Sequence, residues 1–270
     1  MNPLTLTLKE IPRQRVDLSP LTPETLAGMN FNKIITLELT SGNRKIRVAD
    51  LFELSGEDAG NLMIKNSCDK LDRIGQGMRR GSIQVRGNAG AYLGVGMRNG
   101  AIHVHGDTGV FAASGMKDGL ICIRGDAGDF LAAAIPGDRH GMIGGTVMVA
   151  GNAGDRVGDH MRRGNVLIEG NAGDYCGSRM LAGTIAVLGK AGHFTGYGMK
   201  RGTLLFFGVP PMPATFNDCG VHNFNYLPLL IKSWQSLDSK FAKLAPRARA
   251  RRYMGDLANS GKGEILVLIN

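Results

Sequence analysis

Basic side chains recur directly after a methionine in a repeated pattern, and they are the residues here best suited to chemistry. Five of seven such positions are basic, namely Arg79, Arg98, Lys117, Arg162 and Lys200. Lysine and arginine pair with carboxylates, so evenly spaced ones could bind successive charges of an extended polyanion. Because stacked like charges repel each other, the alternative to an anion-binding role is that these side chains form a solvated corner, which keeps the protein soluble.

Two histidines form the arrangement that most resembles a metal site. His103 and His105 alternate with apolar residues on one segment, and Cys122 and Arg124 hold the equivalent places one repeat later. Imidazole and thiolate are zinc ligands, but an arginine beside His105 opposes a cation. We therefore predict no metal here.

The four cysteines also have no CxxC spacing, which argues against a zinc ribbon, an iron–sulfur site or a disulfide scaffold.

The familiar catalytic and nucleotide-binding motifs are missing from the sequence. It has no Gly-Lys-Ser/Thr loop and no His-Glu-x-x-His segment. Glycine runs such as Gly94-x-Gly96-x-x-x-Gly100 differ in spacing from a dinucleotide fingerprint. We expect no catalytic residue and no covalently bound cofactor. The alternative is an independent active site near Asp138, Arg139 and His140, which predicts turnover by the isolated chain.

A 19-residue repeat must position these side chains. Its glycines are separated by 19, 19, 26, 19, 19 and 19 residues, and they are Gly87, Gly106, Gly125, Gly151, Gly170, Gly189 and Gly208. The methionine column, predicted to be core, is Met78, Met97, Met116, Met142, Met161, Met180 and Met199. The 26-residue step predicts an inserted loop within Ala133–His140.

Apolar residues alternate within each repeat, as in Ile102/Val104 and Ile121/Ile123, which predicts a strand with one buried face. The period is too short for a βαβ unit of about 30 residues or a propeller blade of about 40. It suits one coil of a parallel β-helix. With an imperfect opening repeat at Leu62–Asn66, we predict an all-β fold, a right-handed parallel β-helix of about eight coils.

Less regular segments flank the repeats. We predict a small β-rich cap over residues 1–60, the β-helix over 61–208 and an extension with a helix over 209–270. The elements expected in the flanks are a strand at Leu4–Leu8, a hairpin of Ile35–Leu39 with Ile46–Val48, a short helix beginning within Leu51–Leu54, a helix at Tyr226–Leu244 and a strand at Ile265–Ile269.

The outward positions of the last repeats are apolar, at Leu167, Ala186, Leu205 and Phe207. They require a cover, either the C-terminal helix or a partner subunit. The final apolar strand likewise needs a partner, either the last coil or another subunit.

Composition narrows the function classes. The net charge of +9 favours an acidic ligand or partner. Aromatic residues make up only 6% and do not alternate with basic ones, so we predict no nucleic-acid binding. No signal-peptide pattern or 18-residue apolar run is present, so we predict a cytoplasmic protein without a membrane segment.

The repeat resembles a known family. The segment Gly94-Val95-Gly96-Met97-Arg98-Asn99-Gly100, followed by Ile102, Val104 and Gly106-Asp107-Thr108-Gly109, is similar to the C-terminal β-helix domain of glutamate synthase. With the tail segment Gly261-Lys262-Gly263-Glu264-Ile265, the chain resembles the C subunit of formylmethanofuran dehydrogenase and its bacterial counterpart, the gamma subunit of the formyltransferase/hydrolase complex.

That resemblance implies a non-catalytic scaffold that assembles with amidohydrolase-like, molybdopterin-enzyme-like and formyltransferase subunits. The complex would transfer a formyl group between tetrahydromethanopterin and a methanofuran-type carrier, and hydrolyse it to formate. The carrier's polyglutamate tail would be the anion bound by Arg79, Arg98, Lys117, Arg162 and Lys200. Two alternatives remain: the C subunit of a CO2-reducing, tungsten- or molybdenum-containing formylmethanofuran dehydrogenase, and a glutamate-synthase-like structural domain.

Overall fold

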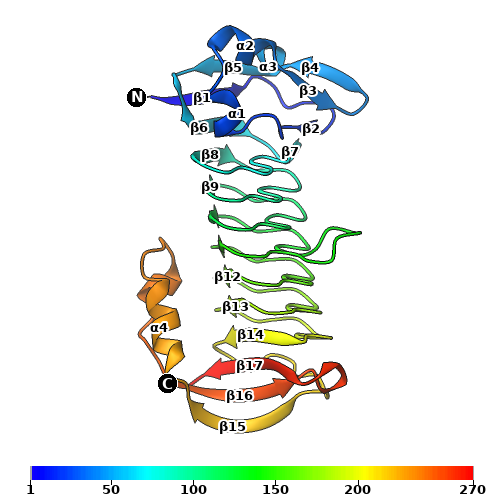
Figure 1. Ribbon diagram of the computed structural model, residues 1–270, viewed down its shortest axis with the longest axis vertical. Coiled ribbons are helices and arrows are strands. Elements are labelled where there is room, and N and C mark those ends of the chain that lie inside the picture. Colours follow the sequence, from blue (N-terminus) through cyan, green and yellow to red (C-terminus); the bar gives the residue numbers. More distant parts are fainter. Residues whose placement is uncertain (1, 270) are drawn as a thin grey trace.

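The computed structural model describes residues 2–269 and is built mostly of β-strands. One sheet has thirteen strands, in the order β15-β16-β17-β14-β13-β12-β11-β10-β9-β8-β6-β1-β5. Its central strands follow sequence order and lie above one another along the long axis (Figure 1). They are β6 (Asp58–Ser67), β8 (Ser82–Gly87), β9 (Ala101–Val104), β10 (Leu120–Ile123), β11 (Thr146–Val149), β12 (Asn165–Ile168), β13 (Thr184–Val187) and β14 (Arg201–Phe206).

Successive repeats contact each other at several places, of which three recur most plainly. The strands pair in parallel, with Ile83 beside Ile102 and Ile102 beside Ile121. A second ladder of parallel bridges begins with Ala89 beside Thr108. At a third place, from Met97 onward, the N–H after each methionine of the column donates to the methionine carbonyl of the preceding repeat. We call these stacked repeats, residues 58–206, the stack.

The interior of the stack confirms the predicted core. The seven methionines of the repeat column are fully buried, as are inward residues such as Ile102 and Val104. The glycine that precedes each strand is needed because backbones approach closely there. Gly100 has φ of +99°, and a Cβ on it would lie 2.5 Å from the Cε of Met78. The insertion also lies where the sequence placed it, and it projects from the stack as an exposed loop (Figure 1).

The N-terminal segment extends the stack at one end. Strand β1 (Pro3–Leu8), as predicted, pairs in parallel with β6 and antiparallel with β5 (Phe52–Ser55). A separate four-stranded sheet comprises β4 (Arg44–Arg47), β3 (Glu38–Ser41), β2 (Val16–Asp17) and β7 (Leu71–Asp72). Three short helices complete the segment: α1 (Pro23–Leu26), α2 (Phe31–Thr36) and α3 (Val48–Leu51).

Two predictions for this segment need correction. The hairpin exists as β3–β4, but Ile35 and Thr36 belong to α2, whose first turn is capped by the Asn30 side chain accepting from the Lys33 N–H. The helix expected from Leu51 instead ends there, and Phe52–Ser55 is β5. Short apolar runs fit helix and strand equally well, so tertiary pairing decided both cases. The division at residues 60 and 208 stays a prediction.

The C-terminal segment closes the other end of the stack. Strand β17 (Lys262–Leu268) pairs in parallel with β14, so the last strand of the stack supplies the partner that the final strand requires. Strand β16 (Arg249–Gly255) pairs antiparallel with β17, and β15 (Asn217–Asn223) pairs antiparallel with β16. Short 3₁₀ turns lie at Lys240–Lys243 and Leu257–Asn259.

The predicted helix at Tyr226–Leu244 is wrong in length. Helix α4 spans Tyr226–Ser233, and the chain then turns within a serine- and aspartate-containing stretch of low helix propensity. Leu229, expected on the buried face, is 70% exposed, whereas Leu227 and Ile231 are fully buried. We call residues 224–244 the arm, because they lie alongside the later strands of the stack (Figure 1).

Candidate functional site

The basic column emerges at one corner of the stack. The backbone N–H of Arg98 donates to the Met78 carbonyl at 2.7 Å, and that of Lys117 donates to the Met97 carbonyl at the same distance. Arg162 and Lys200 bond to the preceding repeat in the same way, at 2.8 Å. Because each residue is held in register next to a buried methionine, the side chains project from equivalent places. All five predicted residues are exposed.

The structure divides these five residues into unequal groups. Arg79, Arg98 and Lys117 lie on three successive repeats, about 4.8 Å apart along the backbone ladder. Ile143 and Leu181 occupy the intervening repeats and separate Arg162 and Lys200 from them and from each other. The neighbouring column contributes further cations at Arg80, Arg163 and Arg201. We call these eight basic side chains the ridge; its first part alone presents three charges in direct succession.

Acidic groups lie near this corner at two places. Glu24 on α1 accepts from the backbone N–H of Arg79 at 3.0 Å, and Asp118 accepts from the N–H of Gly119. Both carboxylates are therefore engaged with backbone. A corner with eight cations and these two acids remains strongly positive, which suits an anionic ligand.

The two histidines line a shallow groove on the outward face of β8, β9 and β10. The groove has a volume of about 260 Å³ and is lined by Gln84, Arg86, His103, Val104, His105, Cys122 and Arg124. Parallel register places Arg86, His105 and Arg124 side by side in one column. Arg86 Nη1 lies 3.3 Å from His105 Nδ1.

The fixed charges of Arg86 and Arg124 in this groove favour an anion over a cation. Burial, followed by the positive charge of nearby arginines, lowers the pKa of His103 and His105. Burial also raises the pKa of the Cys122 thiol to about 11. A protonated thiol beside two guanidinium groups is a poor metal ligand. No cluster of three or more metal-ligating side chains occurs within residues 2–269.

An aromatic column was missed by the sequence interpretation. At one corner of the stack, aromatic rings of successive repeats lie face to face. The Phe111 ring centroid is 5.5 Å from that of Tyr92 and 4.6 Å from that of Phe130. Arg156 continues the column, its guanidinium 4.6 Å from the Tyr175 ring centroid. The complete column is Arg73, Tyr92, Phe111, Phe130, Arg156, Tyr175 and Phe194. The 19-residue spacing of these planar side chains was the signal that could have identified it.

A buried carboxylate was also missed. The Asp159 side chain is only 5% exposed and accepts hydrogen bonds from Ser178 Oγ at 2.7 Å and from Arg179 Nε at 2.9 Å. Arg179 Nη2 donates to its other oxygen at 2.5 Å, and His160 Nδ1 lies 3.3 Å from that oxygen. Ser178 bonds to Asp159 and not to His160, so this is not a nucleophile–base pair.

The inserted loop rises from this carboxylate cluster. Ala134 donates its N–H to the Asp159 carbonyl and Gly141 donates to the His160 carbonyl, both at 3.0 Å. Asp138 and Arg139 are exposed at the tip. The structure therefore joins the inserted loop to the hydrogen-bonded cluster around Asp159.

Comparisons with known proteins agree with this geometry. The GXGXG motif family matches residues 64–219. The chain also matches a chain of the crystal structure of the formyltransferase/hydrolase complex (FhcABCD) from Methylorubrum extorquens in complex with methylofuran. That match has 39% identity and a TM-score of 0.90 over 98% of this chain and 100% of the other. This chain belongs to the GXGXG family and, within it, to the C subunits of formylmethanofuran dehydrogenases and formyltransferase/hydrolase complexes.

Curated members of this C-subunit family match over shorter segments. The C subunit of the formyltransferase/hydrolase complex Fhc of Methylorubrum extorquens is 40% identical over 89 residues, 33% of this chain and 34% of the relative. The C subunit of tungsten-containing formylmethanofuran dehydrogenase 2 of Methanococcus maripaludis is 37% identical over 95 residues, 34% of this chain and 35% of the relative. These alignments thus span about a third of the curated relatives.

Proposed function

We propose that this chain is the non-catalytic scaffold subunit of a formyltransferase/hydrolase complex. The complex would transfer a formyl group between tetrahydromethanopterin and a methanofuran-type carrier and hydrolyse it to formate, a reaction sequence of methylotrophic one-carbon metabolism. The single observation that supports this most is the match along nearly the whole chain to a chain of the FhcABCD structure. Polar side chains in and next to the stack, such as Asp159 and Glu24, accept hydrogen bonds from neighbouring backbone and side-chain groups, which is consistent with a structural role.

The stack is proposed to be a right-handed parallel β-helix of about eight coils. The recurring contacts between repeats support this interpretation, because a chain that returns to the same positions every 19 residues must wind around an axis. A β-helix presents equivalent residues in straight rows, which is the property a scaffold needs for several partners.

The proposed partners are an amidohydrolase-like, a molybdopterin-enzyme-like and a formyltransferase subunit of the same hetero-oligomeric complex. The proposed location is the cytoplasm. Within residues 2–269, no helix has the length and apolarity needed to cross a bilayer. The relatives named above favour this assignment over a glutamate-synthase-like domain.

The ridge is proposed to hold the polyglutamate tail of the carrier. Carboxylates spaced along a flexible chain could pair with Arg79, Arg98 and Lys117 in turn, while Arg162 and Lys200 would bind further along the tail. The complex that contains the structural relative was crystallised with methylofuran, which supports a carrier of this class.

Purification of the chain from its host, under native conditions, tests the assignment. We expect three co-purifying subunits of the proposed classes and formyl transfer by the complex but not by the isolated chain. Turnover by the isolated chain would contradict the scaffold role.

The alternative is the C subunit of a CO2-reducing formylmethanofuran dehydrogenase. Curated relatives with that name, at 37% and 35% identity, favour it. Elemental analysis of the purified complex separates the two assignments, because the dehydrogenase requires stoichiometric tungsten or molybdenum and the hydrolytic complex does not.

A further inference from the structure

The outward face of the stack changes character along its length. Under the arm it is apolar and fully covered: Met148, Leu167, Ala186 and Leu205 are at most 1% exposed and pack with Trp234 and other arm residues. On the earlier strands β8 and β9 the equivalent positions are Gln84 and His103, and the arm does not reach them (Figure 1). A polypeptide segment thus covers half of a continuous face and leaves the other half open.

The tip of the arm marks the boundary between the two halves. Arg124, the residue directly after β10, pairs with the side chain of Asp238, which belongs to the turn at the end of the arm. The next residues along this column toward the N-terminus are His105 and Arg86. The structure therefore already contains one example of an acidic residue, Asp238, that binds this column, at Arg124.

The open half is rich in hydrogen-bond donors. Arg86 donates toward His105 Nδ1 at 3.3 Å, and a neutral imidazole that accepts at Nδ1 carries its proton on Nε2. Gln84 adds a side-chain amide, and Arg86 keeps further guanidinium N–H groups. The carboxylate of Asp58, near the far end of this face, already accepts hydrogen bonds from Gly60 N–H and Asn61 Nδ2. A carboxylate placed over the groove would meet donors on both sides.

We propose that the groove of β8–β10 docks an acidic segment of another subunit, whose carboxylates pair with Arg86 and His105 and extend the contact that Asp238 makes with Arg124. This rests on the proposed function, in that the partner is a subunit of the same complex. A protein segment fits better than a free anion because the groove is shallow and continues a face on which the arm already packs. The partner's charge follows from the cation Arg86 and from the pairing of Asp238 with Arg124 in the same column.

Site-directed cross-linking in the assembled complex tests the proposal. A photoreactive p-benzoylphenylalanine replaces Gln84, the purified complex is irradiated, and cross-linked peptides are identified by mass spectrometry. We expect a peptide of another subunit with aspartate or glutamate close to the cross-linked residue. The matched control carries the same group at Asn152, an exposed residue at a different corner, and should not capture that peptide. Cross-linking to the carrier, to a second copy of this chain or to a peptide without acidic residues overturns the proposal.

Charge reversal supplies an independent measurement. Arg86→Glu should weaken association of the complex about tenfold, seen as dissociation at lower salt in native mass spectrometry. Arg86→Lys should retain most of the association, and Arg44→Glu on β4 should leave it unchanged. Equal weakening by Arg86→Glu and Arg44→Glu overturns the proposal. If the wild-type chain assembles with its partners but Gln84 captures none of them, the docking proposal fails alone; if the wild-type chain assembles with none, the proposed function fails.

Discussion

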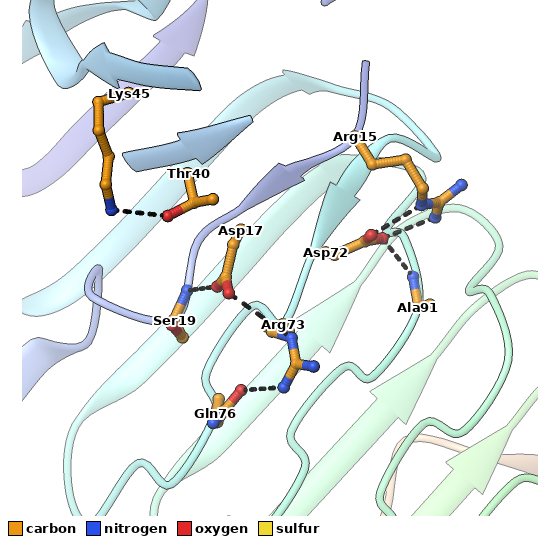
Figure 2. Close-up of polar contacts among 9 residues, drawn as sticks. All are labelled: Arg15, Asp17, Ser19, Thr40, Lys45, Asp72, Arg73, Gln76 and Ala91. Carbon is orange, nitrogen blue, oxygen red and sulfur yellow. Dashed lines mark hydrogen bonds and ion pairs between the residues drawn. The ribbon is translucent and has the colours of Figure 1, made fainter. Parts of the chain in front are cut away.

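Arg15 donates from Nε and Nη2 to the two carboxylate oxygens of Asp72, at 2.7 and 2.6 Å. Asp72 Oδ1 also accepts the backbone N–H of Ala91 at 2.8 Å (Figure 2). Beside this pair, Asp17 lies 3.6 Å from Arg73 Nε. One carboxylate therefore ties the N-terminal segment to the first two repeats of the stack.

Asp72→Ala should destabilise the chain more than Arg15→Ala. Removing the carboxylate leaves the Ala91 N–H without its acceptor, at a cost of about 1–3 kcal/mol. Arg15 is half exposed, so its loss should cost about 0.5 kcal/mol. Urea unfolding of each variant measures both values, with Arg47→Ala, a member of an exposed pair, as control. Equal losses for the two variants would show that Asp72 does not hold Ala91.

The single tryptophan reports on the arm. Trp234 is 2% exposed, and its ring packs edge-on against Phe241 at 5.5 Å. Leu167→Asp places a charge under the arm, so we expect the arm to detach and the fluorescence maximum to shift to longer wavelength. Lys232→Ala, on the exposed side of α4, should leave the emission unchanged. A blue emission that survives Leu167→Asp would contradict packing of the arm on β12.

Thiol reactivity should follow burial. Burial raises the pKa of Cys122 to about 11 and of Cys176 to about 12, so at pH 8 only about one Cys122 thiol in a thousand is ionised. Exposed Cys219 should therefore react with iodoacetamide first, and Cys176 only after unfolding. Peptide mass spectrometry over a labelling time course measures the order. Labelling in urea, where all four cysteines should react, is the control.

Removing the Asp159 carboxylate should lower the stability of the fold, and a second substitution at Arg179 should restore part of it. Asp159→Ala leaves the buried Ser178 hydroxyl without a partner, at about 1–3 kcal/mol. Arg179 has φ of +51°, where the equivalent Gly198 has +68°, and a glycine there relieves about 1 kcal/mol of strain. The double variant Asp159→Ala/Arg179→Gly should therefore be more stable than Asp159→Ala alone in thermal unfolding. A lower melting temperature for the double variant would contradict this.

Carrier retention should depend most on the contiguous part of the ridge. Arg98→Glu interrupts three successive cations, whereas Arg162→Glu alters a position between Ile143 and Leu181, so Arg98→Glu should lose more carrier. Carrier that remains after gel filtration, measured by mass spectrometry, should also fall as salt rises. Simultaneous reversal of Arg79, Arg98 and Arg162 with unchanged retention would exclude the ridge.

The fold could be predicted from the sequence where the sequence repeats with a fixed period. The repeat placed Ile102 over Ile83 and buried Met97 in the core, because a fixed period with fixed chemistry permits one register. The flanks lack that period. The predictions for Ile35, Thr36 and residues 234–244 are therefore wrong, since short apolar runs do not distinguish helix from strand before a packing partner is known.

The sequence by itself determined the stack, its inserted loop, the basic column and the need to cover the late apolar face. Only the tertiary structure decided that β17 pairs with β14, that Trp234 joins Leu167 in one apolar cluster, and that Asp238 reaches Arg124. The physical reason is separation along the chain. Repeats contact their neighbours at a constant spacing that the residues display, whereas these pairings join segments far apart in sequence, through surfaces that become complementary only when the chain has folded.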